Sequence, residues 1–408
     1  MLDANVGETL PALAGLRVID MGHAIAGPFA ATLMGDMGAD VIKIERPGGG
    51  DALRNMGARE GETPIWWKVA GRNKRSVTLD FTTEAGKEIL LRLASVSDVL
   101  IENFRPGTLE RHGLGWTDLH AANPRLVMLR VSGYGQVGPK ASLPGFGRVA
   151  EAMSGAAHLT GDADGPPVLV GYSLADELVG LTGAFGILAA LLARLRSGAG
   201  ECIDLALYEP LFRFIDWQVS MYEQTGQVAH RAGAQLPRAL GDGLTGGMVR
   251  TKDGVWMAYS AATDSVLVRL ISLVMGEEAL ADPRFSDVSA RRLNPEAVQE
   301  AVARWVGARS ANQVEEEFAS NHTVIARVFD VEDIINDSTF AARENIIRIN
   351  DDDLGELAMP NVVPKLLNAP GRVRWTGPSL GAHTDEVLME LCNLTKQKID
   401  ELHVKGVV

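Results

Sequence analysis

Cysteine is scarce in this sequence, and so is positive charge. Only Cys202 and Cys392 occur among 408 residues, which argues against a disulfide framework and indicates a reducing cytoplasm as the setting. The 39 Lys and Arg residues are outnumbered by 52 Asp and Glu, giving a net charge of −13. This balance argues against nucleic-acid binding as the main role. An anionic ligand would need a local cluster of basic side chains.

Metal-ligand spacing, targeting segments and membrane spans are also missing. The eight histidines are scattered, so we expect no metal site. The N-terminus is acidic and lacks the basic start and apolar centre of a signal peptide. One long apolar run, residues 178–195, contains Gly180 and Arg194 and has no aromatic anchors. We therefore expect a buried helix there and no association with a membrane.

The N-terminal part alternates between short β-rich runs and helical segments. Strand, helix and strand at this spacing predict a parallel, doubly wound, Rossmann-like sheet that binds ligands at the carboxyl ends of its strands. His23, Arg46, Phe81, Asn103 and Ser132 follow predicted strands directly. The predicted strands are residues 16–20, 40–45, 76–80, 98–102 and 125–131, and the helices between them are residues 28–38 and 84–94.

A chain of 408 residues is too long for one ordinary core, and its middle changes character. Residues 248–259 read as a β-hairpin that turns at Lys-Asp-Gly, and mostly helical sequence follows. We predict an α/β fold in which both chain ends form the large domain (1–205 and 321–408) and residues 206–320 form an inserted, smaller α+β domain.

Asp176 is the strongest catalytic candidate. It stands between a turn and a continuous apolar helical pattern, so it should lie at or near a helix N-terminus. The exposed N–H groups and the helix dipole favour negative charge there, and we expect the carboxylate to stay ionised at neutral pH. Such a carboxylate can attack an activated acyl group. The alternative is that Asp176 only caps a core helix.

The other motifs are ambiguous when taken alone. Residues 133–138 (GYGQVG) fit the dinucleotide fingerprint, but Pro139 and Pro144 prevent the helix that should follow, so a nicotinamide cofactor is disfavoured. Arg72 and Arg75, with Arg105 and Arg111, could bind phosphate or carboxylate, or could be solvated surface residues.

Together these segments resemble the family III CoA-transferases, which include formyl-CoA transferase, carnitine CoA-transferase and the α-methylacyl-CoA racemases. The resemblance runs almost the full length of the chain. It rests on residues 13–20 (LAGLRVID), 26–28 (AGP), 38–47 (GADVIKIERP), 73–76 (NKRS), 102–107 (ENFRPG), 133–136 (GYGQ), 165–167 (GPP), 175–177 (ADE), 186–191 (GILAAL) and 380–388 (LGAHTDEVL).

The resemblance implies an interlocked homodimer and a site for an acyl-CoA substrate, with no tightly bound cofactor. The family's nucleophile is an aspartate that corresponds to Asp176 here. Its CoA contacts fall on Ile25, Ala26, Arg46, Leu79, Asp80, Phe81, Thr82, Asn103, Phe104, Arg105 and Arg111.

The resemblance also implies a mechanism. The aspartate takes the acyl group from a donor acyl-CoA as a mixed anhydride and then becomes an aspartyl-CoA thioester. An acceptor carboxylate reverses the sequence. A glycine-rich lid in the family corresponds in position to residues 241–247, which include Gly246 and Gly247, although the sequence match there is not close.

One position separates transferase from racemase. The racemases use a histidine in a Gly-His-Asp segment, and here that segment reads Gly145, Phe146, Gly147. Phe146 cannot exchange a proton, so the transferase branch is favoured and racemase is the alternative. Formyl or oxalyl substrates are also disfavoured, because that branch carries a glutamine where this chain has Ile25.

The acids themselves are less well defined. A succinyl-CoA donor and a dicarboxylate acceptor are predicted, and the candidates to bind the second carboxylate include four arginines. A noncatalytic CoA-binding protein is the remaining alternative. The substrate-binding candidates are His23, Arg72, Arg75, Arg231, Arg238, Phe146, Gly246 and Gly247.

Overall fold

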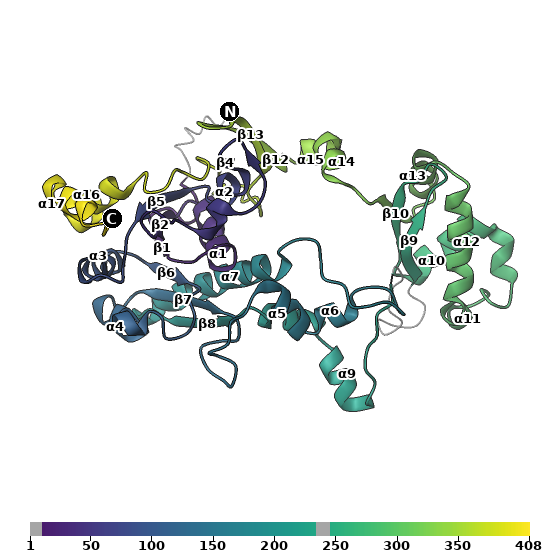
Figure 1. Cartoon of the computed structure of the whole chain (residues 1–408). Coiled ribbons are helices and arrows are strands. Elements are labelled where there is room, and N and C mark those ends of the chain that lie inside the picture. Colours follow the sequence, from purple (N-terminus) through teal and green to yellow (C-terminus); the bar gives the residue numbers. More distant parts are fainter. Residues whose placement is uncertain (1–9, 234–244) are drawn as a thin grey trace, which may run out of the picture. The chain divides into compact units, whose positions relative to one another are not determined.

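The computed structural model describes residues 10–233 and 245–408. Within these residues the chain forms two compact units (Figure 1). Unit 1 comprises the described residues up to 154, residues 170–214 and residues 338–408. Unit 2 comprises residues 155–169 and 215–337. Each unit has its own sheet, and the large sheet belongs to unit 1.

Unit 1 is built on a six-stranded sheet in the order β5-β2-β1-β6-β7-β8, and every neighbouring pair is parallel. This confirms the predicted α/β class with a large parallel sheet. The central strands are buried on both faces, as their continuous Val, Ile and Leu runs predict. The strands are β1 (Arg17–Asp20), β2 (Asp40–Glu45), β5 (Lys74–Thr78), β6 (Val99–Glu102), β7 (Val127–Ser132) and β8 (Cys202–Ala206).

One face of this sheet carries a large apolar core. Ile19, Ile42, Leu100 and Met128 project into it from four neighbouring strands. The C-terminal helices complete the core, and the main-chain N–H of Asp80 donates to the Val407 carbonyl (2.7 Å). The two ends of the chain therefore belong to one unit. The helices on this face are α3 (Glu84–Ser95), α4 (Trp116–Ala122), α16 (Thr384–Cys392) and α17 (Lys396–Val404).

The other face is covered by α1 (Ala26–Asp36) and α7 (Leu174–Ser197), which pack against each other and against the strands. Glycine allows the close approach of these two helices. A Cβ on Gly180 would lie 2.8 Å from the Ala26 carbonyl oxygen and 2.9 Å from the Phe29 side chain. Close packing here holds the start of α7 against the start of α1, at the carboxyl edge of the sheet.

Among the described residues, α7 is the one helix that is long and apolar enough to cross a membrane by length and composition. Val179 and Ile187 are fully buried between α7 and its neighbours. A buried core helix passes the same test, so this property is weak support for a membrane span.

Unit 2 contains a three-stranded antiparallel sheet in the order β11-β10-β9 and its own apolar core, which includes Met257, Phe285 and Phe318. The expected hairpin is present as β9 (Thr245–Arg250) and β10 (Trp256–Ala261). We expected residues 321–337 to belong to the large domain, but β11 (Val324–Arg327) pairs with β10. The compact unit therefore extends to Asp337. Its helices include α10 (Asp264–Met275), α11 (Val288–Leu293), α12 (Pro295–Gly307) and α13 (Ala311–Ser320).

Shorter elements complete the chain. A two-stranded hairpin, formed by β12 and β13, belongs to unit 1. Its Asp351 forms an ion pair with the buried Lys68 (2.9 Å). The shorter elements are the 3-10 turns Ala52–Asn55, Glu110–His112 and Glu277–Ala281, the strands β3 (Arg59–Glu60), β4 (Thr63–Pro64), β12 (Ile346–Asp351) and β13 (Gly355–Pro360), and the helices α2 (Ile65–Ala70), α5 (Gly147–Met153), α6 (Ala156–Leu159), α8 (Glu209–Ile215), α9 (Gln218–Thr225), α14 (Val331–Asn336) and α15 (Ser338–Ala342).

Candidate active site

Asp176 lies in the first turn of α7, as its sequence context predicts. Its side chain is partly buried, and its pKa is raised to about 6 by burial and by the nearby carboxylates of Glu177 and Glu151. We expected the helix terminus to favour the charge, but loss of water and like-charge repulsion outweigh that effect. With a pKa of about 6, the carboxylate is still mostly ionised at neutral pH.

The Asp176 carboxylate fits closely against Gly147, the first residue of α5. A Cβ at Gly147 would overlap the carboxylate of Asp176, so only glycine leaves room for that side chain. Within residues 10–233 and 245–408, the Asp176 carboxylate accepts no hydrogen bond and forms no ion pair. A partly buried carboxylate without a partner keeps its lone pairs available for a ligand.

Asp176 opens into a cavity of about 620 Å³ that lies within unit 1. Its walls come from the segments that follow β1, β6 and β7 and from the first turns of α5 and α7. This is the carboxyl edge of the parallel sheet, where ligand sites are expected. The lining residues are His23, Ala24, Ile25, Ala26, Ala52, Met56, Trp66, Asn103, Val131, Ser132, Gly133, Gly145, Phe146, Gly147, Arg148, Glu151, Gly171, Tyr172, Ser173, Asp176 and Leu207.

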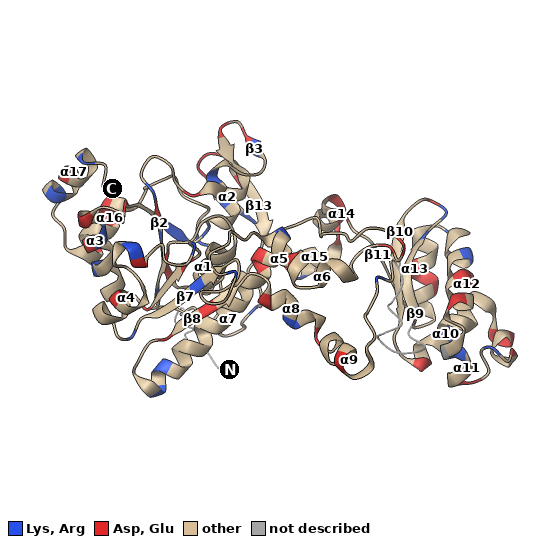
Figure 2. Cartoon of the chain, turned by 60° about the horizontal axis from the view of Figure 1, so that its bottom comes forward, with Lys and Arg blue, Asp and Glu red and all other residues tan. Residues whose placement is uncertain are grey.

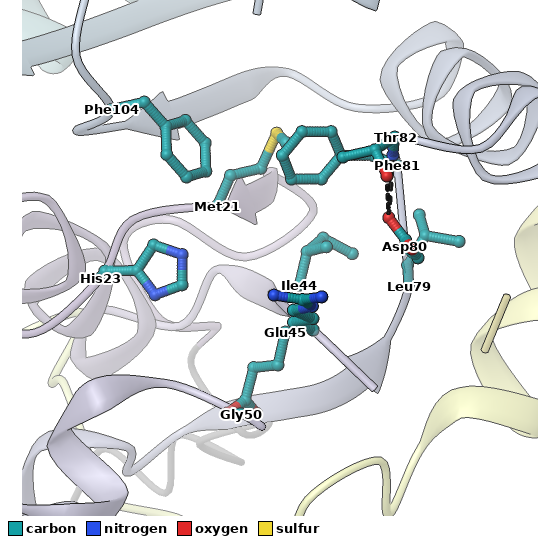
Figure 3. A pocket seen from close by; sticks show the side chains of 11 residues that line it. Met21, His23, Ile44, Glu45, Gly50, Leu79, Asp80, Phe81, Thr82 and Phe104 are labelled. Atoms are coloured by element: carbon teal, nitrogen blue, oxygen red, sulfur yellow. Dashed lines mark hydrogen bonds between the residues drawn. The ribbon is translucent and has the colours of Figure 1, made fainter. Parts of the chain in front are cut away.

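A second pocket of about 380 Å³ lies nearby on the same edge (Figure 3). Figure 3 shows Met21, Phe81 and Phe104 together, with His23 beside them. The rings of Phe81 and Phe104 are 5.6 Å apart, and those of His23 and Phe104 are 5.5 Å apart. The lining residues are Met21, His23, Ile44, Glu45, Arg46, Gly50, Leu79, Asp80, Phe81, Thr82 and Phe104.

His23 lines both pockets and therefore stands at their junction. Reciprocal bonds fix its backbone, because its N–H donates to Asn103 Oδ1 (2.7 Å) and Asn103 Nδ2 donates to its carbonyl (2.9 Å). Burial and the nearby ammonium of Lys43 lower the pKa of its imidazole. His23 is therefore neutral at physiological pH and contributes hydrogen bonding rather than charge.

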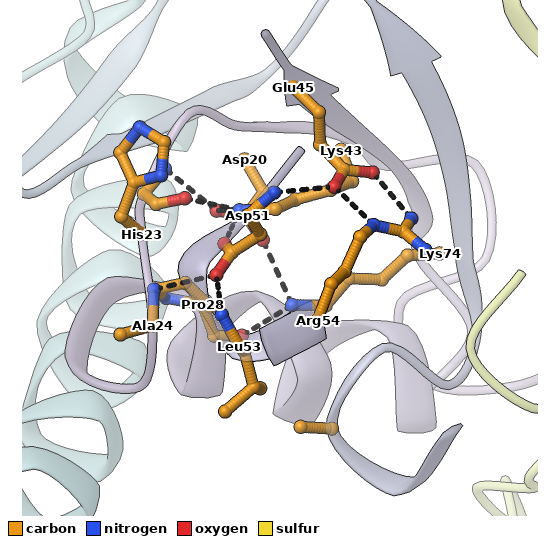
Figure 4. Close-up of polar contacts among 12 residues, drawn as sticks. Asp20, His23, Ala24, Pro28, Lys43, Glu45, Asp51, Leu53, Arg54 and Lys74 are labelled. Carbon is orange, nitrogen blue, oxygen red and sulfur yellow. Dashed lines mark hydrogen bonds and ion pairs between the residues drawn. The ribbon is translucent and has the colours of Figure 1, made fainter. Parts of the chain in front are cut away.

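A buried network of charges supports the segment around His23 (Figure 4). Lys43 is fully buried and pairs with Asp51 (2.8 Å) and Asp20 (3.6 Å), and Lys74 pairs with Asp20 (2.9 Å). Burial alone would lower the pKa of Lys43, but the two carboxylates raise it above its ordinary value. Burial opposes the charge of Asp51 too, yet Lys43 lowers the pKa of that carboxyl to about 2. Lys43 and Asp51 are therefore both charged at neutral pH.

The same network continues through Glu45. Arg54 donates to both Glu45 oxygens (2.7 and 2.8 Å), and the Ser76 hydroxyl donates to Oε2 (2.6 Å). Arg54 also stacks on the Trp67 ring at 3.8 Å. Since Asp51 accepts the Ala24 N–H (2.9 Å), the network positions the loop after β1 against the loop after β2. Figure 2 shows Lys and Arg at the centre of unit 1 as well as on outer helices.

The structure brings most of the expected CoA-binding residues to these two pockets. Arg46, Leu79, Asp80, Phe81, Thr82 and Phe104 line the smaller pocket, and Ile25, Ala26 and Asn103 line the larger one. Arg105 and Arg111 are exposed and line neither pocket, and Arg111 donates to the neighbouring Thr108 hydroxyl (3.2 Å).

Three of the arginines expected to bind a substrate carboxylate are engaged elsewhere. Arg72 is buried and pairs with both oxygens of Asp36 (3.0 and 2.6 Å). Arg75 pairs with Asp40 and with Glu386 and Glu390 of α16. In unit 2, Arg231 donates to the carbonyls of His158, Asp162 and Gly165. These arginines bind partners within the chain, and a substrate role for them stays a prediction. Arg238 lies outside the described residues.

The remaining expected residues divide between the two units. Phe146 is exposed and lines the cavity of Asp176, as expected of a substrate contact. Gly246 and Gly247 lie in β9 of unit 2, paired with Ser260 and Tyr259, so they are strand residues rather than loop residues. Residues 241–244 of the expected lid lie outside the described residues.

The structure adds polar residues that sequence reasoning overlooked, namely Arg148 and Glu151 of α5. Glu151 is buried and accepts the Val170 N–H (3.3 Å), whereas Arg148 is exposed. The Ser132 hydroxyl is buried and has no hydrogen-bond partner among the described residues. The sequence signal for these two residues was the short helix that begins at Gly147, because its first turn faces the same edge of the sheet as the first turn of α7. The described part of the chain contains no cluster of three or more His, Cys, Asp or Glu residues that could hold a metal.

Comparison with known proteins identifies the family of this chain. The sequence profile described as CoA-transferase family III matches residues 13–384. The chain is similar to the succinyl-CoA–L-malate CoA-transferase beta subunit of Chloroflexus aurantiacus, with 44% identity over 98% of both chains. It is also similar to the succinyl-CoA–D-citramalate CoA-transferase of the same organism, with 39% identity over 96% of this chain and 97% of the other.

A solved structure shares the fold. The crystal structure of a CAIB/BAIF family protein from Brucella suis is 29% identical, covers 94% of this chain and 100% of that one, and superposes with a TM-score of 0.81. A profile match across nearly the whole sequence, relatives matched end to end and a shared fold all agree. The chain belongs to CoA-transferase family III and is an enzyme of that family.

Proposed function

We propose that the enzyme moves CoA from succinyl-CoA to a small dicarboxylic acid through covalent intermediates on Asp176. The observation that carries this proposal is the Asp176 carboxylate, which is partly buried, accepts no hydrogen bond among the described residues and faces a cavity large enough for an acyl group. The donor and acceptor classes come from the relatives that transfer CoA from succinyl-CoA to malate or citramalate.

The chemistry runs in two matched halves. An oxygen of Asp176 attacks the thioester carbonyl of the donor, the C–S bond breaks, and a mixed anhydride and CoA thiolate form. The thiolate then attacks the aspartyl carbonyl and releases the donor acid as its carboxylate, which leaves an aspartyl-CoA thioester. The acceptor carboxylate attacks that thioester and releases the thiolate, which finally attacks the acceptor carbonyl and frees Asp176. No net proton transfer and no ATP are needed.

The environment of Asp176 suits this reaction. A carboxylate that water and hydrogen bonds do not stabilise is a stronger nucleophile than a solvated one, and the raised pKa of about 6 reflects that missing stabilisation. The charge remains available at neutral pH. Water must be kept away from the anhydride and the thioester during the reaction, because it would hydrolyse both.

The two pockets divide the CoA thioester between them. We place the nucleotide of CoA in the smaller pocket, where Arg46 can contact phosphate and the rings of Phe81 and Phe104 offer apolar surface. The acyl group then lies in the larger cavity against Asp176. His23 borders both pockets, so the pantetheine arm passes beside it.

The test is trapping of the intermediate. Intact-mass spectrometry of enzyme mixed with succinyl-CoA, followed by hydroxylamine or borohydride, should show modification at Asp176 together with free succinate. No adduct, combined with α-proton exchange of a 2-methylacyl-CoA in deuterated water, would support the racemase alternative instead. Phe146 argues against that alternative, because it lines the cavity and cannot carry a proton.

We also propose that the enzyme is a homodimer, as its family resemblance implies. The outer face of α7 supports this proposal, because an exposed apolar stripe of this length is typical of an interface. Light scattering at micromolar concentration should give twice the mass of the chain, and a monomer would contradict the proposal. The exposed apolar residues of this helix are Leu181, Phe185, Leu188, Leu192 and Leu195.

A further inference from the structure

The carboxylates that line the cavity around Asp176 would repel the dicarboxylic substrates proposed above. Asp176 and Glu151 both contribute carboxylates to its lining. The CoA mono-thioester of a dicarboxylic acid adds a third negative charge through its distal carboxylate, and a dicarboxylate acceptor adds two. A cation in the same cavity would offset this repulsion, because like charges repel one another at close range.

Arg148 is the one lysine or arginine among the residues that line this cavity in the described part of the chain. His23 cannot take its place, because burial lowers the pKa of its imidazole and leaves the ring neutral. Arg148 is permanently charged. It forms no hydrogen bond or ion pair within residues 10–233 and 245–408, whereas Arg72 and Arg75 are saturated by carboxylates.

The backbone places Arg148 next to the nucleophile. It follows Gly147 directly, and Gly147 is so close to Asp176 that a Cβ there would overlap the carboxylate. The long side chain of Arg148 can therefore reach the far end of a short acyl group whose carbonyl lies at Asp176. A planar guanidinium with free donors matches a carboxylate through two parallel hydrogen bonds.

We propose that Arg148 binds the distal carboxylate of the acyl group and so selects dicarboxylic over monocarboxylic substrates. This inference rests on the proposed transfer of CoA at Asp176. Arg148 contacts neither the thioester carbonyl nor the CoA moiety, so it acts on the choice of acid and not on the covalent steps. The same contact serves both halves of the reaction, because donor and acceptor each carry a second carboxylate.

The test compares substrates that differ only in the distal group. Initial rates of the wild type, Arg148→Ala and Arg148→Lys are measured with succinyl-CoA and with butyryl-CoA, which has the same chain length and no second carboxylate. Arg148→Ala should lower kcat/KM for succinyl-CoA roughly ten- to a hundredfold, as expected for loss of a charge-assisted pair, and leave the butyryl-CoA value unchanged. Arg148→Lys should lie between, because it keeps the charge but loses the paired geometry.

Arg125→Ala is the matched control. Arg125 is also exposed, but it precedes β7 at the opposite edge of the sheet, so this variant should behave as wild type. An unchanged succinyl-to-butyryl preference in Arg148→Ala would overturn the inference. An equal loss with both thioesters would overturn it too, since it would place Arg148 on CoA. If the wild type transfers CoA from neither thioester, the proposed function itself fails and the inference falls with it.

Discussion

Two aspartates of unit 1, Asp51 and Asp176, differ in their partners and in their pKa. Asp51 is buried, pairs with Lys43 and accepts two main-chain N–H groups, and its pKa is lowered to about 2. Asp176 is partly buried and has no hydrogen-bond partner among the described residues, and its pKa is raised to about 6. Both side chains line or support the same edge of one sheet. The more deeply buried carboxyl has the lower pKa, so partners rather than depth account for the difference in pKa.

This contrast separates carboxylates that stabilise the fold from carboxylates that are available to react. A paired carboxylate has its lone pairs occupied and holds two segments of chain together. A carboxylate without partners costs stability, and proteins retain such groups where the charge acts on a ligand. The arginines divide in the same way, since Arg54 is bound to Glu45 whereas Arg46 and Arg148 are exposed at the pockets. We infer from this division that the unpaired groups form the site.

Replacement of Asp176 gives the largest expected effect. Asp176→Asn should lower the rate of transfer on the order of 10⁴-fold or more, because it removes the nucleophile of a covalent step. Folding and CoA affinity should be retained, since the side chain holds nothing else in place. Initial-rate assays, circular dichroism and calorimetric titration with CoA measure the three quantities. Turnover close to wild type would contradict the role of Asp176.

Replacement of Lys43 should instead damage the fold. Lys43→Met leaves Asp51 buried without its cation, and removal of one partner from a buried pair costs about 3–5 kcal/mol. Thermal unfolding should therefore show a clear loss in Tm. Asp176→Asn in the same assay is the control and should show no loss. Equal Tm values for the two variants would contradict the distinction between paired and unpaired groups.

The two arginines after β2 offer a matched pair. Arg46→Ala should raise KM for every acyl-CoA by about tenfold, as expected for one lost phosphate contact, with little change in Tm. Arg54→Ala should lower Tm because Glu45 loses its partner in a buried network. Steady-state kinetics over several acyl-CoAs, with melting curves for both variants, distinguish them. Unchanged KM values in Arg46→Ala would contradict the placement of the CoA nucleotide in the smaller pocket.

The smallest expected effect is a shift in pH dependence. The activity should fall as the pH drops below about 6, because protonation of Asp176 removes the nucleophile. The nearby Glu151 raises that pKa, so Glu151→Gln should move the midpoint of kcat/KM to lower pH. An unchanged midpoint would show that Glu151 has no influence on the nucleophile.

The same titration affects stability with a defined sign. The folded state holds a proton on Asp176 more tightly than the unfolded state, so the wild type loses stability as pH rises from the ordinary aspartate range to about 6. Asp176→Asn removes this loss. Its advantage in Tm over the wild type should therefore be small in acid and reach its full value above pH 6.

Local sequence patterns were sufficient for five of the six strands of the sheet and for the position of Asp176, whereas β8 was not predicted. The strands read from apolar runs agree closely with β1, β2, β6 and β7, and the turn before residue 174 predicts the start of α7. The expected CoA-binding segments lie at strand ends, so the topology alone brings most of them together. Arg105 and Arg111 are the exceptions, since neither lines either of the two pockets described above.

The tertiary structure decided which charged groups are free. Nothing near Arg72 or Arg75 in the sequence reveals that Asp36 and α16 neutralise them, because those partners are distant in the chain. The same holds for the pKa of Asp176, which burial and the neighbouring Glu151 raise against the effect of the helix terminus. The sequence by itself determined the family, the parallel sheet and the candidate nucleophile, since these depend on local order. Only the folded chain determined the pairing of charges, because an ion pair depends on proximity in space.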